Sequence, residues 1–268
     1  MKMRDTQRRA GRIGLAAMAG LLMAACGSSP PDTISLPAGR AAASVGDVRT
    51  ESIKRELTKP GCRGECPRIT LESVAFPGIP ALTQAVDRDL AGMTGVDANL
   101  RGTYRTVDEY IAYFWRTAQP RDRTDLRARV RDAVGDLVGV ELTTEQYLTG
   151  AAHPIPATHF LNWQRGTASE ITLAQMLIPG RGEQYLQALR DAHKAWLKQN
   201  EDARRDPAAY DRNWPFQPTD NVTLTRQGMV VKYDAYAIAP YSHGQPELTL
   251  PYRTLRGILK PEFMPPGS

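Results

Sequence analysis

The four histidines are the residues of this chain best suited to acid–base or metal chemistry. They are His153, His159, His193 and His243. His153 and His159 are close enough in sequence to approach each other in a loop, but a metal site needs a third ligand and no acidic residue stands between them. The sequence therefore predicts hydrogen-bonded or surface histidines, no metal site and no bound cofactor.

Ser242 and His243 are adjacent and have the right types for a nucleophile and its base. Neighbours on a strand point to opposite faces, so we expect this pair not to act together. The chain also lacks a Gly-x-Ser-x-Gly turn, a His-Glu-x-x-His helix, a phosphate-binding loop and a Gly-x-Gly-x-x-Gly turn between strand and helix. We therefore expect a protein that is not an enzyme.

The first 25 residues have the composition of a bacterial secretion signal. Five basic residues within positions 2–12 precede an apolar run at 13–25, which is too short for a membrane span. The run ends Leu-Met-Ala-Ala-Cys-Gly at 22–27 and resembles a lipobox. We predict a lipoprotein signal peptide at 1–25 and lipidation of Cys26, which would anchor the protein in a membrane. The alternative is an ordinary signal peptide with Cys26 merely nearby.

The residue after the predicted lipidation site indicates where the protein would go. Gly27, where an aspartate would favour retention, is typical of lipoproteins sent on to the outer membrane. We expect the protein on the periplasmic face of that membrane.

The basic balance of the whole chain is concentrated in this predicted signal. The chain has 34 Lys and Arg, 29 Asp and Glu, and a net charge of +5. Removal of residues 1–25 would lower the charge to +1, because that segment holds five bases and one acid. We therefore expect no nucleic-acid partner. Residues 26–48, rich in Ser, Pro, Ala and Gly, are predicted to be a flexible tether.

The two remaining cysteines, Cys62 and Cys66, enclose three residues. In an oxidising compartment they are predicted to form a disulfide at the tip of a hairpin, with Gly64 in the turn. The rival interpretations are a metal pair, which lacks further ligands nearby, and a redox motif, which usually has two intervening residues.

Hydrophobic periodicity predicts an α+β fold of antiparallel sheets with helices packed on one face. The predicted elements of the first half are a hairpin at 51–59 and 67–75, a helix from Pro80, a second helix after the capping box at 106–109 that ends before Pro120, and a meander of strands from 126, at 137–148 and at 158–163. In the second half we predict helices at 171–177 and 182–200, a loop at 201–220, a hairpin at 222–233, a strand at 248–250 and a helix at 252–259. The corresponding domain regions are 49–165 and 166–268.

Three arginines share the outer face of the strand that begins near residue 126. Arg127, Arg129 and Arg131 alternate with apolar residues. They are a possible face for an anionic partner. The alternative is a solvated sheet face whose bases pair with acids on adjacent strands, which the near-neutral charge of the mature chain favours.

Two motifs are the most informative segments of the chain. Residues 147–154 read Tyr-Leu-Thr-Gly-Ala-Ala-His-Pro, followed by Phe-Leu-Asn-Trp at 160–163 and Ile-Thr-Leu-Ala-Gln-Met-Leu at 171–177; residues 233–244 read Tyr-Asp-Ala-Tyr-Ala-Ile-Ala-Pro-Tyr-Ser-His-Gly. Together these resemble the RsiV-like family, over about residues 50–260. The first region is similar to the domain that precedes the deacetylase in PdaC. Departures are Ala151, where a second glycine is usual, and the lack of an amino-terminal anti-sigma segment or transmembrane helix.

The resemblance implies binding rather than catalysis, because relatives use this domain to bind lysozyme or carry it beside a peptidoglycan deacetylase domain. We expect a lysozyme-like protein or a peptidoglycan-related ligand as partner. The predicted binding residues are Gly150, His153, Pro154, Pro240, Tyr241 and His243. We expect a positive φ at Gly150. The alternatives are that these residues only shape turns, that the protein is a cell-wall hydrolase acting around His153 and His243, or that it is a structural scaffold of an envelope complex.

Overall fold

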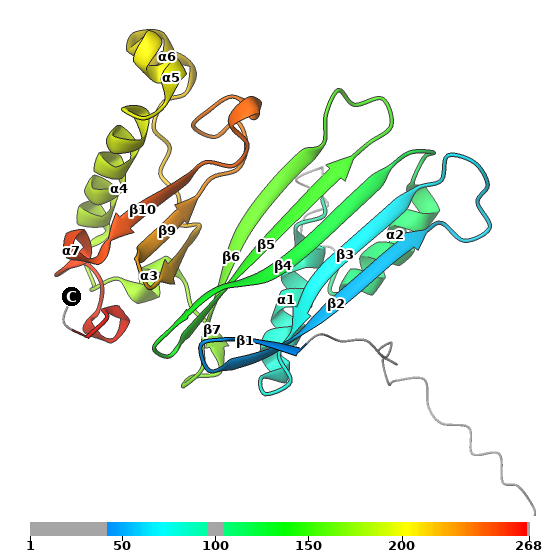
Figure 1. Cartoon of the computed structure of the whole chain (residues 1–268), viewed down its shortest axis with the longest axis horizontal. Coiled ribbons are helices and arrows are strands. Elements are labelled where there is room, and N and C mark those ends of the chain that lie inside the picture. The colour runs from blue at the N-terminus through cyan, green and yellow to red at the C-terminus, as the bar shows by residue number, and fades with distance from the viewer. Residues whose placement is uncertain (1–41, 96–103, 267–268) are drawn as a thin grey trace, which may run out of the picture. The chain divides into compact units, whose positions relative to one another are not determined.

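The computed structural model describes residues 42–95 and 104–266 (Figure 1). The predicted signal peptide at 1–25, the lipidation site Cys26 and residues 26–41 of the predicted tether lie outside the described residues. The described chain builds two sheets, one of seven strands and one of three, with helices beside each. The predicted α+β class is confirmed.

The seven-stranded sheet has its strands in chain order. They are β1 (Ala42–Val45), β2 (Val48–Thr58), β3 (Arg68–Ala75), β4 (Arg123–Val134), β5 (Leu137–Tyr147), β6 (Ile155–Gln164) and β7 (Ser169–Glu170). The predicted hairpin β2–β3 and meander β4–β6 are confirmed. One pair departs from the antiparallel prediction, because β3 and β4 are parallel. The reason is the crossover between them, which contains α1 (Pro80–Gly92) and α2 (Val107–Thr117).

Residues 42–48 correct the predicted tether. They form β1 and the turn into β2, with Val45 paired to Val48, so this part of the chain extends the sheet. The predicted disulfide is present: Cys62 and Cys66 are bonded in the turn between β2 and β3.

The second sheet has the antiparallel order β10–β9–β8. Its strands and the helices of this half are β8 (Val222–Thr225), β9 (Gly228–Lys232), β10 (Glu247–Pro251), α3 (Leu173–Met176), α4 (Gly182–Leu197), α5 (Glu201–Arg205), α6 (Pro207–Asn213) and α7 (Tyr252–Leu255), with short 3-10 turns at Tyr241–His243 and Pro261–Phe263.

Three predictions in this half need correction. The short helix begins after Thr172, which caps it, because Ser169–Glu170 pair with β6 as β7. The predicted loop at 201–220 contains α5 and α6, each started by a side-chain cap, Asn200 and Asp206. The closing helix is shorter than predicted and ends at Leu255.

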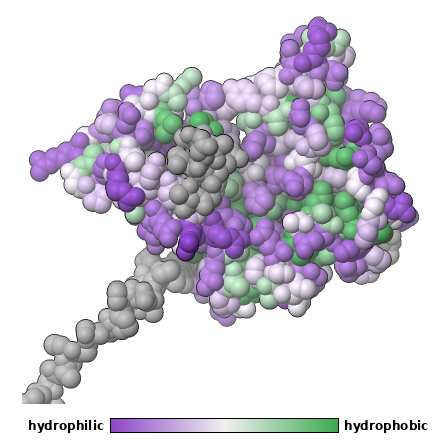
Figure 2. Space-filling model, turned by 180° about the vertical axis from the view of Figure 1, so that it is seen from behind, coloured by the Kyte–Doolittle hydropathy of each residue, from purple (hydrophilic) through white to green (hydrophobic). Residues whose placement is uncertain are grey.

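The main hydrophobic core lies between α1, α2 and one face of the seven-stranded sheet. Leu82 and Leu90 of α1, Leu126 of β4 and Leu142 of β5 are completely buried there. Thr106 caps α2 by accepting a hydrogen bond from the Glu109 amide at 3.1 Å, which is half of the predicted capping box. The Glu109 carboxylate accepts from the Arg105 amide at 2.8 Å instead of from the Thr106 amide. In Figure 1 these helices lie behind the sheet, and the view from that side is largely hydrophilic with smaller hydrophobic areas (Figure 2).

The opposite face of the seven-stranded sheet meets β8 through polar groups, which we call the polar interface. Asn162 of β6 donates to the Val222 carbonyl at 2.7 Å and accepts from the Thr223 hydroxyl at 2.7 Å. Glycine is required at position 139 of β5, because a Cβ there would lie 2.1 Å from the Thr223 Oγ1 atom. The two sheets therefore approach closely along β5 and β8.

No helix within the described ranges 42–95 and 104–266 is long and apolar enough to cross a membrane.

Candidate functional site

Two loops that are distant in sequence meet around His153. The first joins β5 to β6 and contains Gly150, whose φ of +93° confirms the predicted left-handed conformation. The second joins β9 to β10 and supplies Tyr236 and Tyr241. The His153 and Tyr241 rings are stacked with centroids 4.1 Å apart, so the structure brings together two of the residues that the sequence selected.

Hydrogen bonds fix the orientation of the His153 ring. Its Nδ1 lies 2.8 Å from the Pro154 carbonyl oxygen, and its Nε2 lies 3.0 Å from the Tyr236 hydroxyl. Because a carbonyl only accepts, Nδ1 carries the proton of the neutral ring and Nε2 accepts from Tyr236. His153 therefore joins the two loops instead of standing free as a base.

Tyr236 is not among the binding residues predicted from the sequence, although it lies inside the second motif. Its φ of +70° is rare for a bulky residue, and the residue is 48% exposed. The Trp214 ring, which follows α6, lies 6.1 Å from it in a stacked orientation. A strained backbone that holds an aromatic ring in solvent is typical of a functional position.

The large hydrophobic side chains of the described residues that are exposed lie in or next to these two loops. The three large ones are Leu148 at the end of β5, Ile155 at the start of β6, and Tyr236. We call Leu148, His153, Ile155, Tyr236 and Tyr241 the loop surface. Large apolar groups held in solvent by two adjoining loops are typical of a surface that binds a partner.

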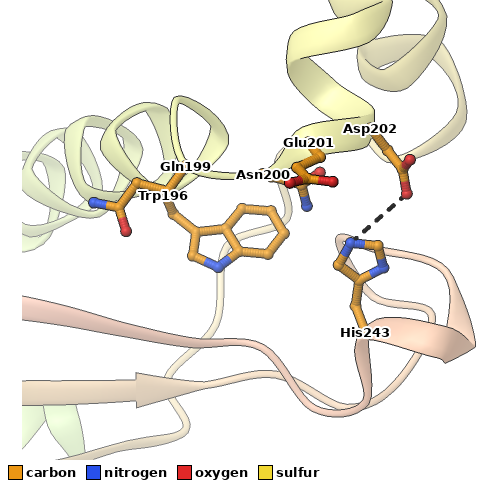
Figure 3. Close-up of a pocket in the computed structure, with 6 residues that line it drawn as sticks. All are labelled: Trp196, Gln199, Asn200, Glu201, Asp202 and His243. Carbon is orange, nitrogen blue, oxygen red and sulfur yellow. Dashed lines mark ion pairs between the residues drawn. The ribbon is translucent and has the colours of Figure 1, made fainter.

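His243 lines a shallow hollow whose lining does not include His153 (Figure 3). Its Nε2 is 3.8 Å from an Asp202 carboxylate oxygen, and its ring stands edge-on to Trp196 with centroids 6.5 Å apart. Gln199, Asn200 and Glu201 complete the lining. Asp202 and Trp196 were not predicted, because they come from α5 and the end of α4, whose approach to the loop is set by tertiary packing.

The prediction that Ser242 and His243 point to opposite faces of a strand is wrong. Residues Tyr241–His243 form a 3-10 turn, and the Ser242 hydroxyl lies 3.5 Å from His243 Nδ1. The contact is at the upper limit of a hydrogen bond, and the Asp202 contact is longer still. Serine, histidine and aspartate are thus near one another, without the short hydrogen bonds of an assembled triad.

Each of the three arginines of the predicted anion face has an acidic partner. Arg127 lies 3.8 Å from Glu72 of β3, while Arg129 and Arg131 lie 2.8 and 3.3 Å from Glu141 of β5. Arg131 also pairs with Glu247 of β10. This is the arrangement that the alternative interpretation expects, with bases neutralised by acids on adjacent strands.

Glu141 is the most deeply buried acid of the polar interface, with 2% of its side chain exposed. Burial raises its pKa, but hydrogen bonds from Lys232 and Arg129 outweigh that effect, so the pKa of Glu141 is lowered overall. The carboxylate stays charged and joins β4 and β5 to β9.

His159 does not share the loop with His153, because it lies within β6. One ring nitrogen of His159 and one carboxylate oxygen each of Asp89 and Glu170 lie within 4.8 Å of one another. This group could not be predicted from the sequence, because its members come from three elements. Among the described residues, these three have metal-ligating side chains whose ligand atoms lie close enough together to hold one ion.

The fold and the loops define an α+β module of two sheets that presents an aromatic and aliphatic surface. Residues 176–253 match the model of a family described as "Protein of unknown function (DUF3298)". The crystal structure of a DUF3298 family protein from Pseudomonas aeruginosa PAO1 is 37% identical and covers 81% of this chain and 97% of its own, with a TM-score of 0.74. The chain therefore belongs to the DUF3298 family.

A DUF3298 family member from Bacteroides fragilis NCTC 9343 shares the fold at 19% identity, covering 82% of this chain and 96% of its own with a TM-score of 0.59. A comparison with curated proteins gave no match. The narrower membership in the RsiV-like family stays a prediction from the two motifs.

Proposed function

We propose that this protein is a non-catalytic binding module of the cell envelope, and that the loop surface docks a partner protein of the lysozyme type. The observation that carries the proposal is the exposed Tyr236, which is held at a left-handed φ beside His153 and Tyr241 where the two loops meet. The exposed side chains of Leu148 and Ile155 stand at the two ends of the first loop. Tyrosine supplies a rigid anchor with a polar tip, which makes it frequent among residues that dominate binding energy.

The composition of the loop surface favours a protein over a glycan. Aromatic rings stack on either kind of ligand, whereas the exposed aliphatic side chains of Leu148 and Ile155 gain most from burial against other apolar side chains. The lysozyme-like identity comes from the resemblance of the two motifs. A peptidoglycan-related ligand is the competing outcome of the test.

The proposed location is the periplasmic face of the outer membrane, with the lipid on Cys26 as anchor. Support comes from the apolar run before Cys26 and from the Cys62–Cys66 disulfide, since disulfides persist in oxidising compartments. Labelling of wild type and Cys26→Ala cells with a radioactive fatty acid tests the anchor. Equal labelling of the two proteins would contradict it.

Binding of the full chain to immobilised lysozyme, and separately to purified sacculi, tests the partner. Tyr236→Ala is expected to weaken lysozyme binding by about tenfold or more, because truncation of a central aromatic anchor commonly costs over 1 kcal/mol. The matched control is Thr167→Ala, an exposed position in the turn at the other end of β6. Binding to sacculi alone would replace the protein partner by a glycan, and loss of neither interaction in Tyr236→Ala would contradict the loop surface.

A hydrolase is the second candidate, favoured by His243 and Asp202, which line one hollow, and by Ser242 next to His243. His243→Ala is the variant that decides it. A hydrolase would lose its activity on purified muropeptides in this variant, whereas a binding module shows no turnover in either protein and retains lysozyme binding in both.

A further inference from the structure

Three metal-ligating side chains converge from separate elements on the helix-covered side of the seven-stranded sheet. Asp89 comes from α1, His159 from β6 and Glu170 from β7, and one ligand atom of each lies within 4.8 Å of the others. His153, His243 and the loop surface take no part in this group. It is therefore independent of the proposed binding function.

Asp89 has an oxygen with no hydrogen-bonding partner. Its Oδ1 accepts from Arg88 Nε at 2.8 Å, but its Oδ2 is buried and has no partner among the described residues. A buried carboxylate oxygen without a donor loses its solvation with no compensation. A cation next to Oδ2 would compensate for this lost solvation.

The other two members also have capacity for a cation. One carboxylate oxygen of Glu170 lies within 4.8 Å of one of Asp89, so the two acids repel each other when both are charged. Neither ring nitrogen of His159 has a hydrogen bond within the described part of the chain. A ring nitrogen with a free lone pair and two crowded carboxylates form a set that a dication stabilises.

We propose that Asp89, His159 and Glu170 bind a divalent transition-metal ion of the zinc type. One imidazole nitrogen and two carboxylate oxygens provide three protein ligands, and water completes the coordination of such an open site. The ion fastens α1 and β6 to β7, the two-residue edge strand that leads into α3. The site thus joins the first sheet to the segment that enters the second half of the chain.

Arg88 is the competitor of the ion. Its guanidinium contacts Asp89 Oδ1 at 2.8 Å and Glu170 Oε2 at 3.2 Å, and half of its side chain is exposed. An exposed ion pair is weak, so a dication displaces it. This gives the proposal a distinctive consequence: removing Arg88 strengthens metal binding.

The experiment is titration of the metal-free full chain with Zn²⁺ by calorimetry, with Co²⁺ absorption as a second measurement of the ligand set. Wild type is expected to bind one equivalent. His159→Ala is expected to lose at least tenfold in affinity, and Arg88→Gln to gain several-fold. His243→Ala is the matched control, because that histidine also lies near a carboxylate, and it is expected to bind as wild type.

Near-ultraviolet circular dichroism verifies that each variant is folded, and Zn²⁺ is expected to raise the unfolding temperature of wild type but not of His159→Ala. Absence of binding in both wild type and Arg88→Gln would overturn the proposal. Equal affinity in wild type and folded His159→Ala, or loss in His243→Ala instead, would overturn it as well.

Discussion

The two faces of the seven-stranded sheet are buried by different chemistry. The face under α1 and α2 is apolar, with Leu90, Leu126 and Leu142 completely buried. The other face meets the three-stranded sheet through the polar interface, where Glu141 and Asn162 are nearly as deeply buried. The side chains named on both faces are buried, but only those of the polar interface need specific hydrogen-bonding or charged partners.

This contrast shows how one sheet gains stability from one face and a defined arrangement from the other. Apolar contacts are non-directional and contribute in proportion to the area removed from water. A buried carboxylate is tolerated only where its cations are correctly placed, so we expect the polar interface to favour one register of β8 and β9 against β4–β6. The loop surface depends on that register, because His153 belongs to one sheet and Tyr236 and Tyr241 to the loop of the other.

Neutralising Glu141 should have the largest effect on this comparison. In Glu141→Gln, Arg131 and Lys232 remain partly buried without their shared counter-charge, and we expect a loss of about 3–5 kcal/mol in the free energy of unfolding, measured in urea. The matched control is Glu72→Gln, because the Glu72–Arg127 pair is half exposed and should contribute at most about 1 kcal/mol. Equal losses of stability in Glu141→Gln and Glu72→Gln would show that the buried ion pairs of the polar interface contribute no more than the exposed Glu72–Arg127 pair.

The pH dependence follows from the lowered pKa of Glu141. A carboxyl group whose folded pKa is lowered stabilises the fold above its unfolded pKa of about 4.3, and this contribution is lost as the pH falls through the folded value. The difference in stability between wild type and Glu141→Gln should therefore narrow below about pH 4. A constant difference down to pH 2 would show that the charge of Glu141 is not responsible.

Leu90→Ala tests the apolar face. The side chain is completely buried in the main hydrophobic core, and its truncation should cost about 2–5 kcal/mol through lost transfer energy and the cavity left behind. Leu148→Ala, at a position 39% exposed, should change the urea midpoint little. A small loss in Leu90→Ala would mean that the polar face contributes more stability than the apolar one.

Gly139→Ala tests how closely the two sheets approach. The new methyl group would overlap Thr223 Oγ1, so we expect a loss of about 1–3 kcal/mol from overpacking, measured by urea unfolding. Gly92→Ala is the control, since a Cβ at that position of α1 meets no atom within 4 Å. Gly139→Ala should also weaken lysozyme binding if the displacement of β8 moves the loop surface.

Thr106→Ala should have the smallest effect. It removes the hydroxyl that accepts from the Glu109 amide, and loss of such a cap costs about 0.5–2 kcal/mol. Thr117→Ala, at the exposed last residue of α2, is the control for a lost hydroxyl without a cap. Urea unfolding monitored by circular dichroism distinguishes Thr106→Ala from Thr117→Ala. Equal unfolding midpoints would show that packing alone stabilises α2.

The sequence was sufficient for elements whose signals are local. The β2–β3 hairpin with its disulfide, the meander β4–β6 and the capped helix α2 each follow from alternation, turn residues or a capping box within a few positions. Helices α5 and α6 were missed although Asn200 and Asp206 are good caps, because each helix is short and the prolines nearby are equally typical of a loop.

The site was predicted only where a motif covered it. His153 and Tyr241 were selected from the two motifs, and their rings are stacked. Asp202, Trp214 and the partners of His159 lie outside those motifs, and their positions depend on how α1, α5 and α6 pack. Periodicity predicts which face of a helix is buried, but not which residue of another element it meets.

The parallel pairing of β3 with β4 also determines how the chain must fold. Ile69 pairs with Thr124, so the sheet is completed only after the intervening segment with both helices has been closed into a loop. Closure of a long loop lowers the chain entropy before any stabilising contact has formed, so non-local strand pairing is slow. We therefore expect the hairpin β2–β3 and the meander β4–β6 to form early as separate units. The pairing of β3 with β4, which brings these units together across α1 and α2, is expected to limit the folding rate.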